Sequence, residues 1–135
     1  MQTTKETQQE KLDEHINIGE MEVGNEDMPR LEPKDCVVIA YESKIVEGHG
    51  RIISFKCNHP NKEKPLSFSR VKYETQNKIG ISGMWVRQDS KGNIQKNSTL
   101  GKCLRYYGAK KPIDMVGKTI HTTGDVNGYL CIKAY

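Results

Sequence analysis

The sequence predicts an all-β domain with one helix, built as a small Greek-key barrel and preceded by an acidic arm. Three observations support this prediction: strand-like runs recur from residue 36 onward, one helical stripe interrupts them, and the charge divides near residue 33. Residues 1–33 hold three Lys or Arg against nine Asp or Glu, a net charge of −6. Residues 34–135 hold 18 against eight, a net charge of +10, so the overall charge of +4 conceals two opposed segments.

Residues 1–33 are expected to form a disordered acidic arm. The segment is rich in Gln, Glu and Thr and contains no aromatic residue. A segment of such low hydrophobicity cannot bury enough apolar surface to fold alone. All nine aromatic residues lie in 34–135, which is long enough to bury a core of its own. The domain boundary is therefore placed between residues 33 and 34.

Four strand-like runs rich in apolar and β-branched residues precede the helix, and turn signals separate them. They are residues 36–41, with a continuation through 45–46 left open, 51–57, 66–73 and 79–87. In the second run, alternation places Ile53, Phe55 and Cys57 on one face. Gly80 and Gly83 in the fourth run favour a bulge or a sharp bend.

One helix follows, because four apolar residues recur at the i, i+3, i+4 and i+7 positions of a helical stripe. These residues are Leu100, Cys103, Leu104 and Tyr107. Asn97 or Ser98 can cap the N-terminus of this helix, and Gly108 stands where a left-handed C-terminal cap is wanted. Residues 118–123 and 129–135 then predict a terminal hairpin.

This order of elements resembles the OB-fold, in which a helix between the third and fourth barrel strands plugs one end. The resemblance covers roughly residues 35–135. The phrase MVGKTI at 115–120 is similar to the start of the strand after the helix, and GYLCIKAY at 128–135 is similar to the closing strand. The five-strand OB pattern accommodates this chain only if residues 66–87 form one bent hairpin. The resemblance implies binding of single-stranded nucleic acid on one face of the sheet.

Basic and aromatic residues alternate along the predicted strands, as a nucleic-acid-binding surface requires. The expected binding set is Arg51, Lys56, Arg70, Lys72, Trp85, Arg87, Tyr129 and Lys133. Trp85 and Arg87 share one face of their strand, which would place a stacking platform beside a phosphate contact. A core position is the alternative for Trp85. Four loop lysines either contact phosphates or merely keep their loops soluble: Lys62, Lys64, Lys110 and Lys111.

Catalytic and metal-binding classes find less support in the sequence. GxSxG, HExxH and a complete phosphate-binding loop are all missing, so neither enzymatic activity nor a cofactor is predicted. Cys57 and His59 stand close enough to chelate zinc, but no second ligand pair accompanies them, and no metal is expected. The chain shows neither a run of about 20 apolar residues nor a signal-like N-terminus. We therefore expect a cytoplasmic protein without membrane contact, whose four cysteines are buried free thiols.

The leading hypothesis is a non-catalytic protein that binds single-stranded DNA or RNA. In this hypothesis the acidic arm, residues 1–33, modulates access to the basic domain or recruits a protein partner. Two alternatives remain: an adaptor between proteins in a replication, phage-encoded or plasmid-encoded complex, and a small metal-dependent nuclease or hydrolase.

Overall fold

The computed structural model describes residues 18–25 and 31–135. The prediction of a disordered arm therefore falls mainly on residues outside the described ones. Within the described part of the arm, η1 (Ile18–Glu20) is a single turn of 3-10 helix whose side chains are exposed.

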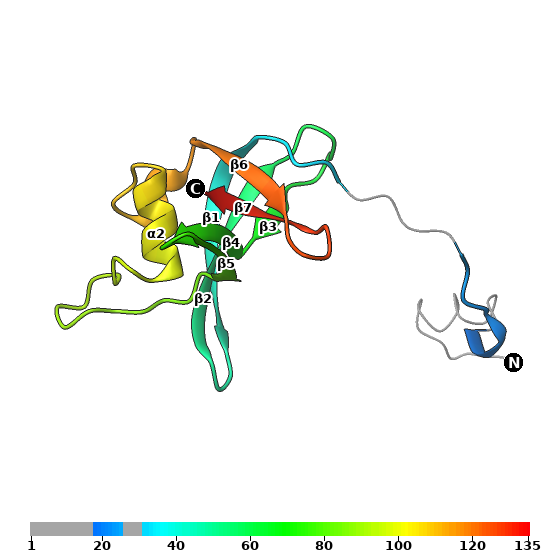
Figure 1. Ribbon diagram of the computed structural model, residues 1–135, viewed down its shortest axis with the longest axis horizontal. Coiled ribbons are helices and arrows are strands. Elements are labelled where there is room, and N and C mark those ends of the chain that lie inside the picture. Colours follow the sequence, from blue (N-terminus) through cyan, green and yellow to red (C-terminus); the bar gives the residue numbers. More distant parts are fainter. Residues whose placement is uncertain (1–17, 26–30) are drawn as a thin grey trace, which may run out of the picture.

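The described domain contains seven strands and one α-helix (Figure 1). The strands are β1 (Cys36–Val46), β2 (Gly50–Asn58), β3 (Leu66–Phe68), β4 (Arg70–Thr75), β5 (Lys78–Gly83), β6 (Thr119–Gly124) and β7 (Leu130–Ala134). The helix α2 (Thr99–Tyr106) and a 3-10 helix η2 (Pro112–Met115) lie between β5 and β6 in the chain. The prediction of a mostly β fold with one helix is thus confirmed for the described residues, and the first strand does continue to residue 46.

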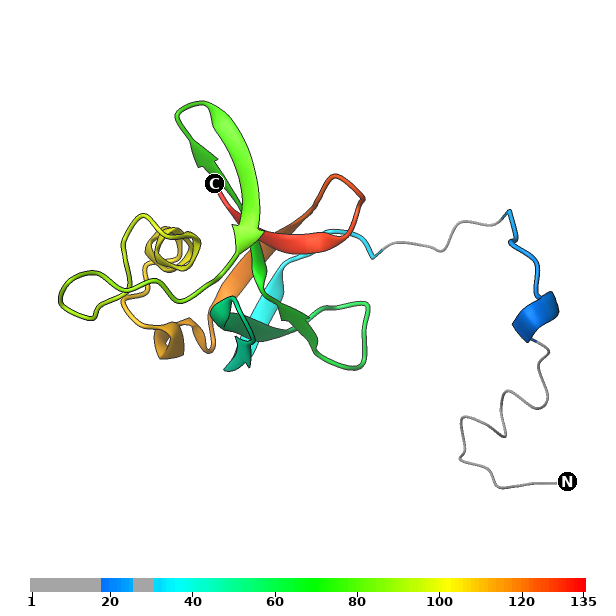
Figure 2. The ribbon, with the colours of Figure 1, turned by 90° about the horizontal axis from the view of Figure 1, so that it is seen from below.

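The strands form one mixed sheet in the order β3-β2-β1-β6-β7-β4-β5. The β4–β7 pair is parallel and the other pairs are antiparallel. Among the described residues no ladder joins the end strands β3 and β5, so closure into a barrel is not established by the strand pairing. Only Ser69 separates β3 from β4 in the chain, although the two strands stand far apart in the sheet order (Figure 2).

Residues 70–83 form a regular antiparallel hairpin, with Arg70 opposite Gly83 and Thr75 opposite Lys78. The register is continuous at both Gly80 and Gly83, so neither glycine marks a bulge. The irregularity lies instead in β1, where the pairing with β2 shifts between Val38 and Ala40. The fourth predicted strand, residues 79–87, is therefore right in type but ends at Gly83, and the third, residues 66–73, is divided at Ser69. The expected bulge is absent from the fourth strand.

The core lies between the sheet and α2. Its largest fully buried side chains include Phe55, Met84, Leu100, Met115, Ile120 and Ile132. Ile53 and Cys57 are buried with Phe55, as alternation along β2 predicts, and Leu100, Cys103 and Leu104 bury the predicted helix stripe. The Ser98 hydroxyl caps α2 by accepting a hydrogen bond from the Gly101 N–H at 3.1 Å. All four cysteines are free and buried, and burial raises the pKa of the Cys57 and Cys103 thiols to about 12.

Contacts with the domain begin slightly before residue 34, the predicted start of the folded part. The carbonyl oxygen of Glu32 lies 2.8 Å from Nε2 of the buried His59. Nδ1 of that ring accepts a hydrogen bond from the Asn61 N–H, so the other ring nitrogen donates to Glu32. Lys34 then donates its N–H to the Thr122 hydroxyl at 2.9 Å. In 18–25 and 31–135 no helix is long and apolar enough to cross a bilayer.

Candidate nucleic-acid interface

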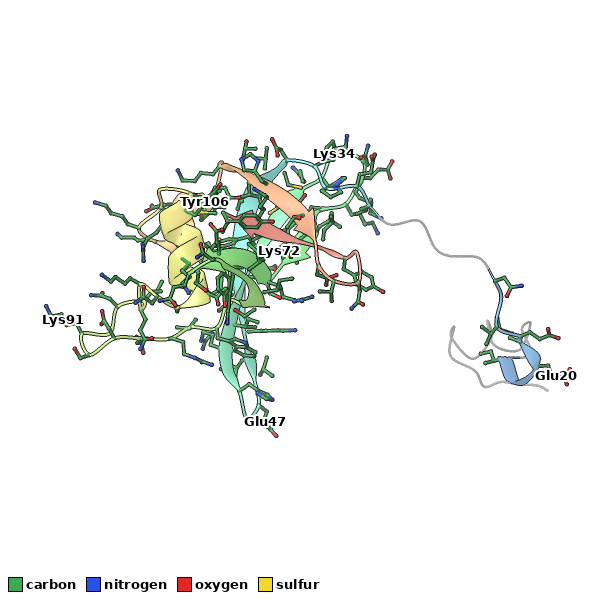
Figure 3. The ribbon with its side chains drawn as sticks, in the orientation of Figure 1. Glu20, Lys34, Glu47, Lys72, Lys91 and Tyr106 are labelled. Carbon is green, nitrogen blue, oxygen red and sulfur yellow. The ribbon has the colours of Figure 1, made fainter. Side chains whose placement is uncertain are left out.

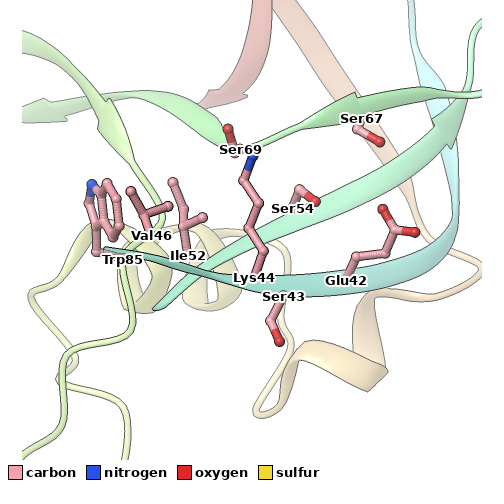
Figure 4. Close-up of a pocket in the computed structure, with 9 residues that line it drawn as sticks. All are labelled: Glu42, Ser43, Lys44, Val46, Ile52, Ser54, Ser67, Ser69 and Trp85. Carbon is pink, nitrogen blue, oxygen red and sulfur yellow. The ribbon is translucent and has the colours of Figure 1, made fainter. Parts of the chain in front are cut away.

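A cleft of about 920 Å³ opens on the outer face of β1, β2 and β3 (Figure 4). Its lining consists of Glu42, Ser43, Lys44, Val46, Ile52, Ser54, Ser67, Ser69 and Trp85. Strand alternation explains why side chains of β2 line the cleft. Ile53 and Phe55 enter the core, so Ser54 between them and Ile52 before them face outward. Apart from Ser43, the lining residues of β1 and β2 thus come from the half of each strand that the core does not use.

The two ends of the cleft differ in chemistry (Figure 4). The Trp85 ring lies beside the aliphatic side chains of Val46 and Ile52 at one end. Hydroxyl and carboxylate groups occupy the other end. Lys44 extends from β1 toward Ser69, between the two ends of the cleft. A flat apolar end next to hydrogen-bonding groups and a cation suits a molecule that combines an aromatic ring with polar or anionic parts.

Backbone pairing with β2 fixes Trp85 at the wall of the cleft. Trp85 forms an isolated antiparallel bridge with Ile52. On either side of it, Ile53 donates its N–H to the Met84 carbonyl at 3.0 Å, and Val86 donates to the Arg51 carbonyl at 2.9 Å. The side chain is half-buried. Trp85 is therefore neither wholly core nor wholly exposed, which were the two positions considered from the sequence.

Two cations of the expected set lie around this cleft. The Arg87 guanidinium carbon is 5.9 Å from the Trp85 ring centroid, within cation–π range. Lys56 lies on the outer face of β2, where its ammonium forms a 3.3 Å ion pair with Glu42. Arg51 belongs to the other side of the β1–β2 hairpin: it donates to the Ser43 hydroxyl at 3.0 Å, and Ser43 points away from Lys44 in Figure 4.

The remaining strand cations lie on the outer face of β4 and β7, where Lys72 stands opposite Lys133 in the parallel ladder. Each of them already has a partner within the chain. Arg70 donates to the Asp125 carboxylate at 2.8 Å, Lys72 to the Gly124 carbonyl at 3.1 Å and Lys133 to the Tyr135 carbonyl at 2.8 Å. Figure 3 shows Lys72 over the middle of the sheet, away from the hairpin tip at Glu47.

Asp125 explains why Arg70 is held in place. Its side chain is only 2% exposed and also accepts hydrogen bonds from the N–H groups of Asn127 and Tyr129 at 2.8 and 2.9 Å. Burial by itself raises the pKa of this carboxyl. The hydrogen bonds from Arg70, Asn127 and Tyr129, together with the Arg70 charge, outweigh burial, so the pKa of Asp125 lies below its ordinary value. The ion pair therefore fixes the β6–β7 turn.

The other expected contacts do not line the cleft. Tyr129 is exposed at a smaller hollow of about 310 Å³, which Leu31 and Leu66 also line and which borders the cleft at Ser67. Lys62 and Lys64 are exposed in the loop between β2 and β3. The backbone N–H groups of Lys110 and Lys111 both donate to the Asp114 carboxylate at 3.1 Å, and their side chains are exposed after α2.

The structure thus divides the predicted surface into two groups rather than one continuous face. It also adds residues to the cleft that the sequence analysis did not select, above all Lys44 and three serines at 54, 67 and 69. The signal that would have found Ser54 was present: it alternates with two core residues of β2 and must face outward. Serine carries neither a charge nor an aromatic ring, so the basic and aromatic pattern that predicts the surface does not include it.

Metal-binding side chains do not converge in the part of the chain that the structure describes. No group of three His, Cys, Asp or Glu residues there could hold a metal ion. Of the pair considered from the sequence, the Cys57 thiol lies in the core and donates to the Phe55 carbonyl, while the His59 ring is engaged by Glu32 and Asn61.

Comparison of the chain with protein-family models, with curated protein sequences and with solved structures gives no match. A function for this protein has to be inferred from the cleft and the charges around it.

Proposed function

We propose that this protein is a non-catalytic nucleic-acid-binding protein that takes a single strand of DNA or RNA into the cleft beside Trp85. One observation carries the proposal: a half-buried Trp ring lies at the apolar end of an open cleft, with the Arg87 guanidinium over it. Stacking on an aromatic ring needs an unpaired base, and a neighbouring cation can contact the phosphate that follows it.

The chemistry of the cleft supports this assignment. Trp85, Val46 and Ile52 offer a flat apolar surface for a base, whereas Ser54 and Lys44 offer hydrogen bonds and charge to a sugar or a phosphate. The +10 charge of residues 34–135 would draw a polyanion to the domain before any close contact forms.

The strand arrangement supports an OB-like barrel as the framework of this site. Residues 66–75 run almost without interruption from a strand paired with β2 to a strand paired with β7, with Ser69 alone between them. A second link comes from the bridge between Ile52 and Trp85, which connects β2 to the segment after β5. In this proposal the two links bring the ends of the open sheet order together, and Trp85 sits on one of them.

Fluorescence provides the direct test, because Trp85 is the only tryptophan in the chain. A fluorescein-labelled oligo(dT) of 20 nucleotides should bind in an anisotropy titration at 50 mM salt and should quench Trp85 emission as it binds. Affinity should fall as salt rises, with a log–log slope of about −0.7 for each phosphate contacted in a single strand. An equally strong response to duplex DNA, binding without salt dependence, or no binding at 50 mM salt would contradict the proposal.

The acidic N-terminal segment has a role in the same proposal, as a competitor for the basic domain. Deleting residues 1–30 removes a net charge of −5 and keeps Leu31 and Glu32, which contact the domain. We expect the shortened protein to keep its melting temperature and to bind oligo(dT) a few-fold more tightly at 50 mM salt. Unchanged affinity would exclude competition and leave the segment a partner-recruiting role.

A further inference from the structure

Two further hollows continue from the cleft past Trp85 toward the helix. The first, of about 340 Å³, shares Trp85 with the cleft and extends to Arg87 and Lys102. The second, of about 350 Å³, shares Tyr73 and Lys102 with the first and reaches the exposed side of α2. Because each hollow borders the next through shared side chains, the three form one path across the molecule.

The helix contributes a compact basic and aromatic surface to the far end of this path. Lys102, Arg105 and Tyr106 stand at the i, i+3 and i+4 positions of α2 and so share one face. Leu100 and Leu104 lie on the opposite, buried face. Lys102, Arg105 and Tyr106 all line the far hollow. Tyr106 is 46% exposed, and its hydroxyl donates to the Tyr135 carbonyl at 3.0 Å, which holds the ring in place.

Two glycines of β5 make room for the aromatic rings along the path. A Cβ on Gly83 would lie 3.1 Å from the Trp85 indole nitrogen, and a Cβ on Gly80 would lie 3.1 Å from the Tyr73 ring. Both rings therefore lie directly against the strand. This close approach gives the two glycines a local purpose in place of the bulge expected from the sequence.

Positive groups follow one another along the path. Arg87 lies near Trp85, and the Lys102 ammonium is 4.5 Å from the Tyr73 ring centroid. Arg105 lines the far hollow; it donates one hydrogen bond to the neutral Lys96 carbonyl at 2.9 Å, which leaves its charge uncompensated. Glu74 is the one carboxylate that lines the two hollows beyond the cleft, within the described residues. The resulting excess of positive charge, interleaved with aromatic rings, is complementary to a single-stranded polyanion.

We propose that a single strand bound in the cleft continues past Trp85 onto the exposed face of α2, where Lys102 and Arg105 contact its phosphates and Tyr106 stacks on a base. This inference rests on the proposed function of the cleft and extends the binding surface to residues on a separate element. The affinity for an oligonucleotide should then increase with its length until both halves of the path are occupied.

A pair of charge-matched double variants tests the extension. The test variant, Lys102→Gln with Arg105→Gln, removes two charges from the path. The control variant, Lys78→Gln with Lys91→Gln, removes two charges outside it. For oligo(dT) of 20 nucleotides at 100 mM salt, the first variant should bind about tenfold more weakly than wild type, with a salt slope less negative by about 1.4. The control variant should stay within about twofold. For oligo(dT) of five nucleotides, followed by quenching of Trp85, both variants should resemble wild type.

The outcomes separate the two proposals. If the wild type binds neither oligonucleotide, the proposed function of the cleft fails. If it binds both and the two variants behave alike, the cleft stands and the extension onto α2 is overturned. Equal weakening of the short and the long oligonucleotide by Lys102→Gln with Arg105→Gln also overturns the extension. Thermal melting checks that the variants fold.

Photo-crosslinking gives a second readout that requires no substitution. A series of 20-nucleotide oligonucleotides carries one 5-iodouridine each, at a different position in each member. The label should crosslink to Trp85 from one position and to Tyr106 from another. Crosslinks that reach Trp85 but never Tyr106 would overturn the extension.

Discussion

The two outer faces of the sheet carry similar cations but hold them differently. On the β4–β7 face, Arg70, Lys72 and Lys133 each donate a hydrogen bond to a carboxylate or carbonyl oxygen of the chain itself. On the cleft face, Lys56 pairs with the exposed Glu42 carboxylate, whereas Arg87 lies over the Trp85 ring and has no carboxylate partner in 18–25 or 31–135. The first arrangement stabilises turns and strand ends, and the second leaves charge available beside an open hollow.

This difference shows why net charge is a weak guide to a binding surface. A cation that already neutralises a buried carboxylate, as Arg70 does with Asp125, adds little attraction for a second anion unless the first bond breaks. The charge of +10 on residues 34–135 counts both kinds of cation equally. The partners of each side chain, rather than the sum, distinguish the two faces.

The largest effect should come from Trp85, with Tyr129 as the aromatic control. Trp85→Ala should weaken binding of oligo(dT) by ten- to 100-fold, because stacking of one base contributes about 1–3 kcal/mol. Tyr129→Ala, at the hollow that Leu31 and Leu66 line, should change affinity by less than twofold. Fluorescence anisotropy at 100 mM salt measures both affinities.

Because Trp85 is half-buried and bridges to Ile52, its removal needs a check on folding. Circular dichroism and a thermal melt provide that check, and Trp85→Phe, which keeps a smaller ring, should recover part of the affinity. A larger loss from Tyr129→Ala than from Trp85→Ala would contradict the assignment of binding to Trp85.

Substituting Arg87 or Arg70 should have smaller effects on oligo(dT) affinity, and the two effects should differ. Arg87→Gln should weaken oligo(dT) binding by about fivefold at 100 mM salt and make the salt slope less negative by about 0.7, as loss of one phosphate contact predicts. Arg70→Gln should leave both quantities nearly unchanged and instead lower the melting temperature, since it leaves Asp125 without its cation. If the two substitutions weaken binding equally, the two faces do not differ in the way proposed.

Local patterns were enough to predict much of the fold. Alternation correctly put Ile53, Phe55 and Cys57 on one face, which the core buries, and the stripe of Leu100, Cys103 and Leu104 correctly predicted the buried face of α2. These features depend on neighbours within one strand or helix, which the order of residues displays directly.

The division of the cations into two faces could not be predicted in the same way. Asp125 stands 55 positions from Arg70, and only the parallel pairing of β4 with β7 and the turn before β7 bring the two together. Gly80 illustrates the same limit: its lack of a side chain favours a bulge when read locally, whereas the Tyr73 ring that fills the space comes from the neighbouring strand. Properties that depend on such distant partners have no local signature.

The smallest effect concerns pH and tests the structural role assigned to the β4–β7 face. The pKa of Asp125 in the folded protein lies below the value of about 3.9 expected in the unfolded chain, so its ionised form stabilises the fold. That stabilisation is present above the unfolded pKa and is lost as pH falls through the folded pKa. Asp125→Asn should therefore lower the melting temperature at pH 7, and the difference from wild type should shrink below about pH 4.

Asp89 offers a matched control for this titration. Its carboxylate accepts hydrogen bonds from the N–H groups of Lys91 and Asn93, in a turn like that of Asp125. Unlike Asp125, it has no ion-pair partner among the described residues. Asp89→Asn should change the melting temperature less at pH 7, and neither substitution should alter oligo(dT) affinity by more than about twofold. A melting-temperature difference for Asp125→Asn that stays constant from pH 7 to pH 3 would show that the Arg70–Asp125 pair does not stabilise this face, and Arg70 would then be available to an incoming anion after all.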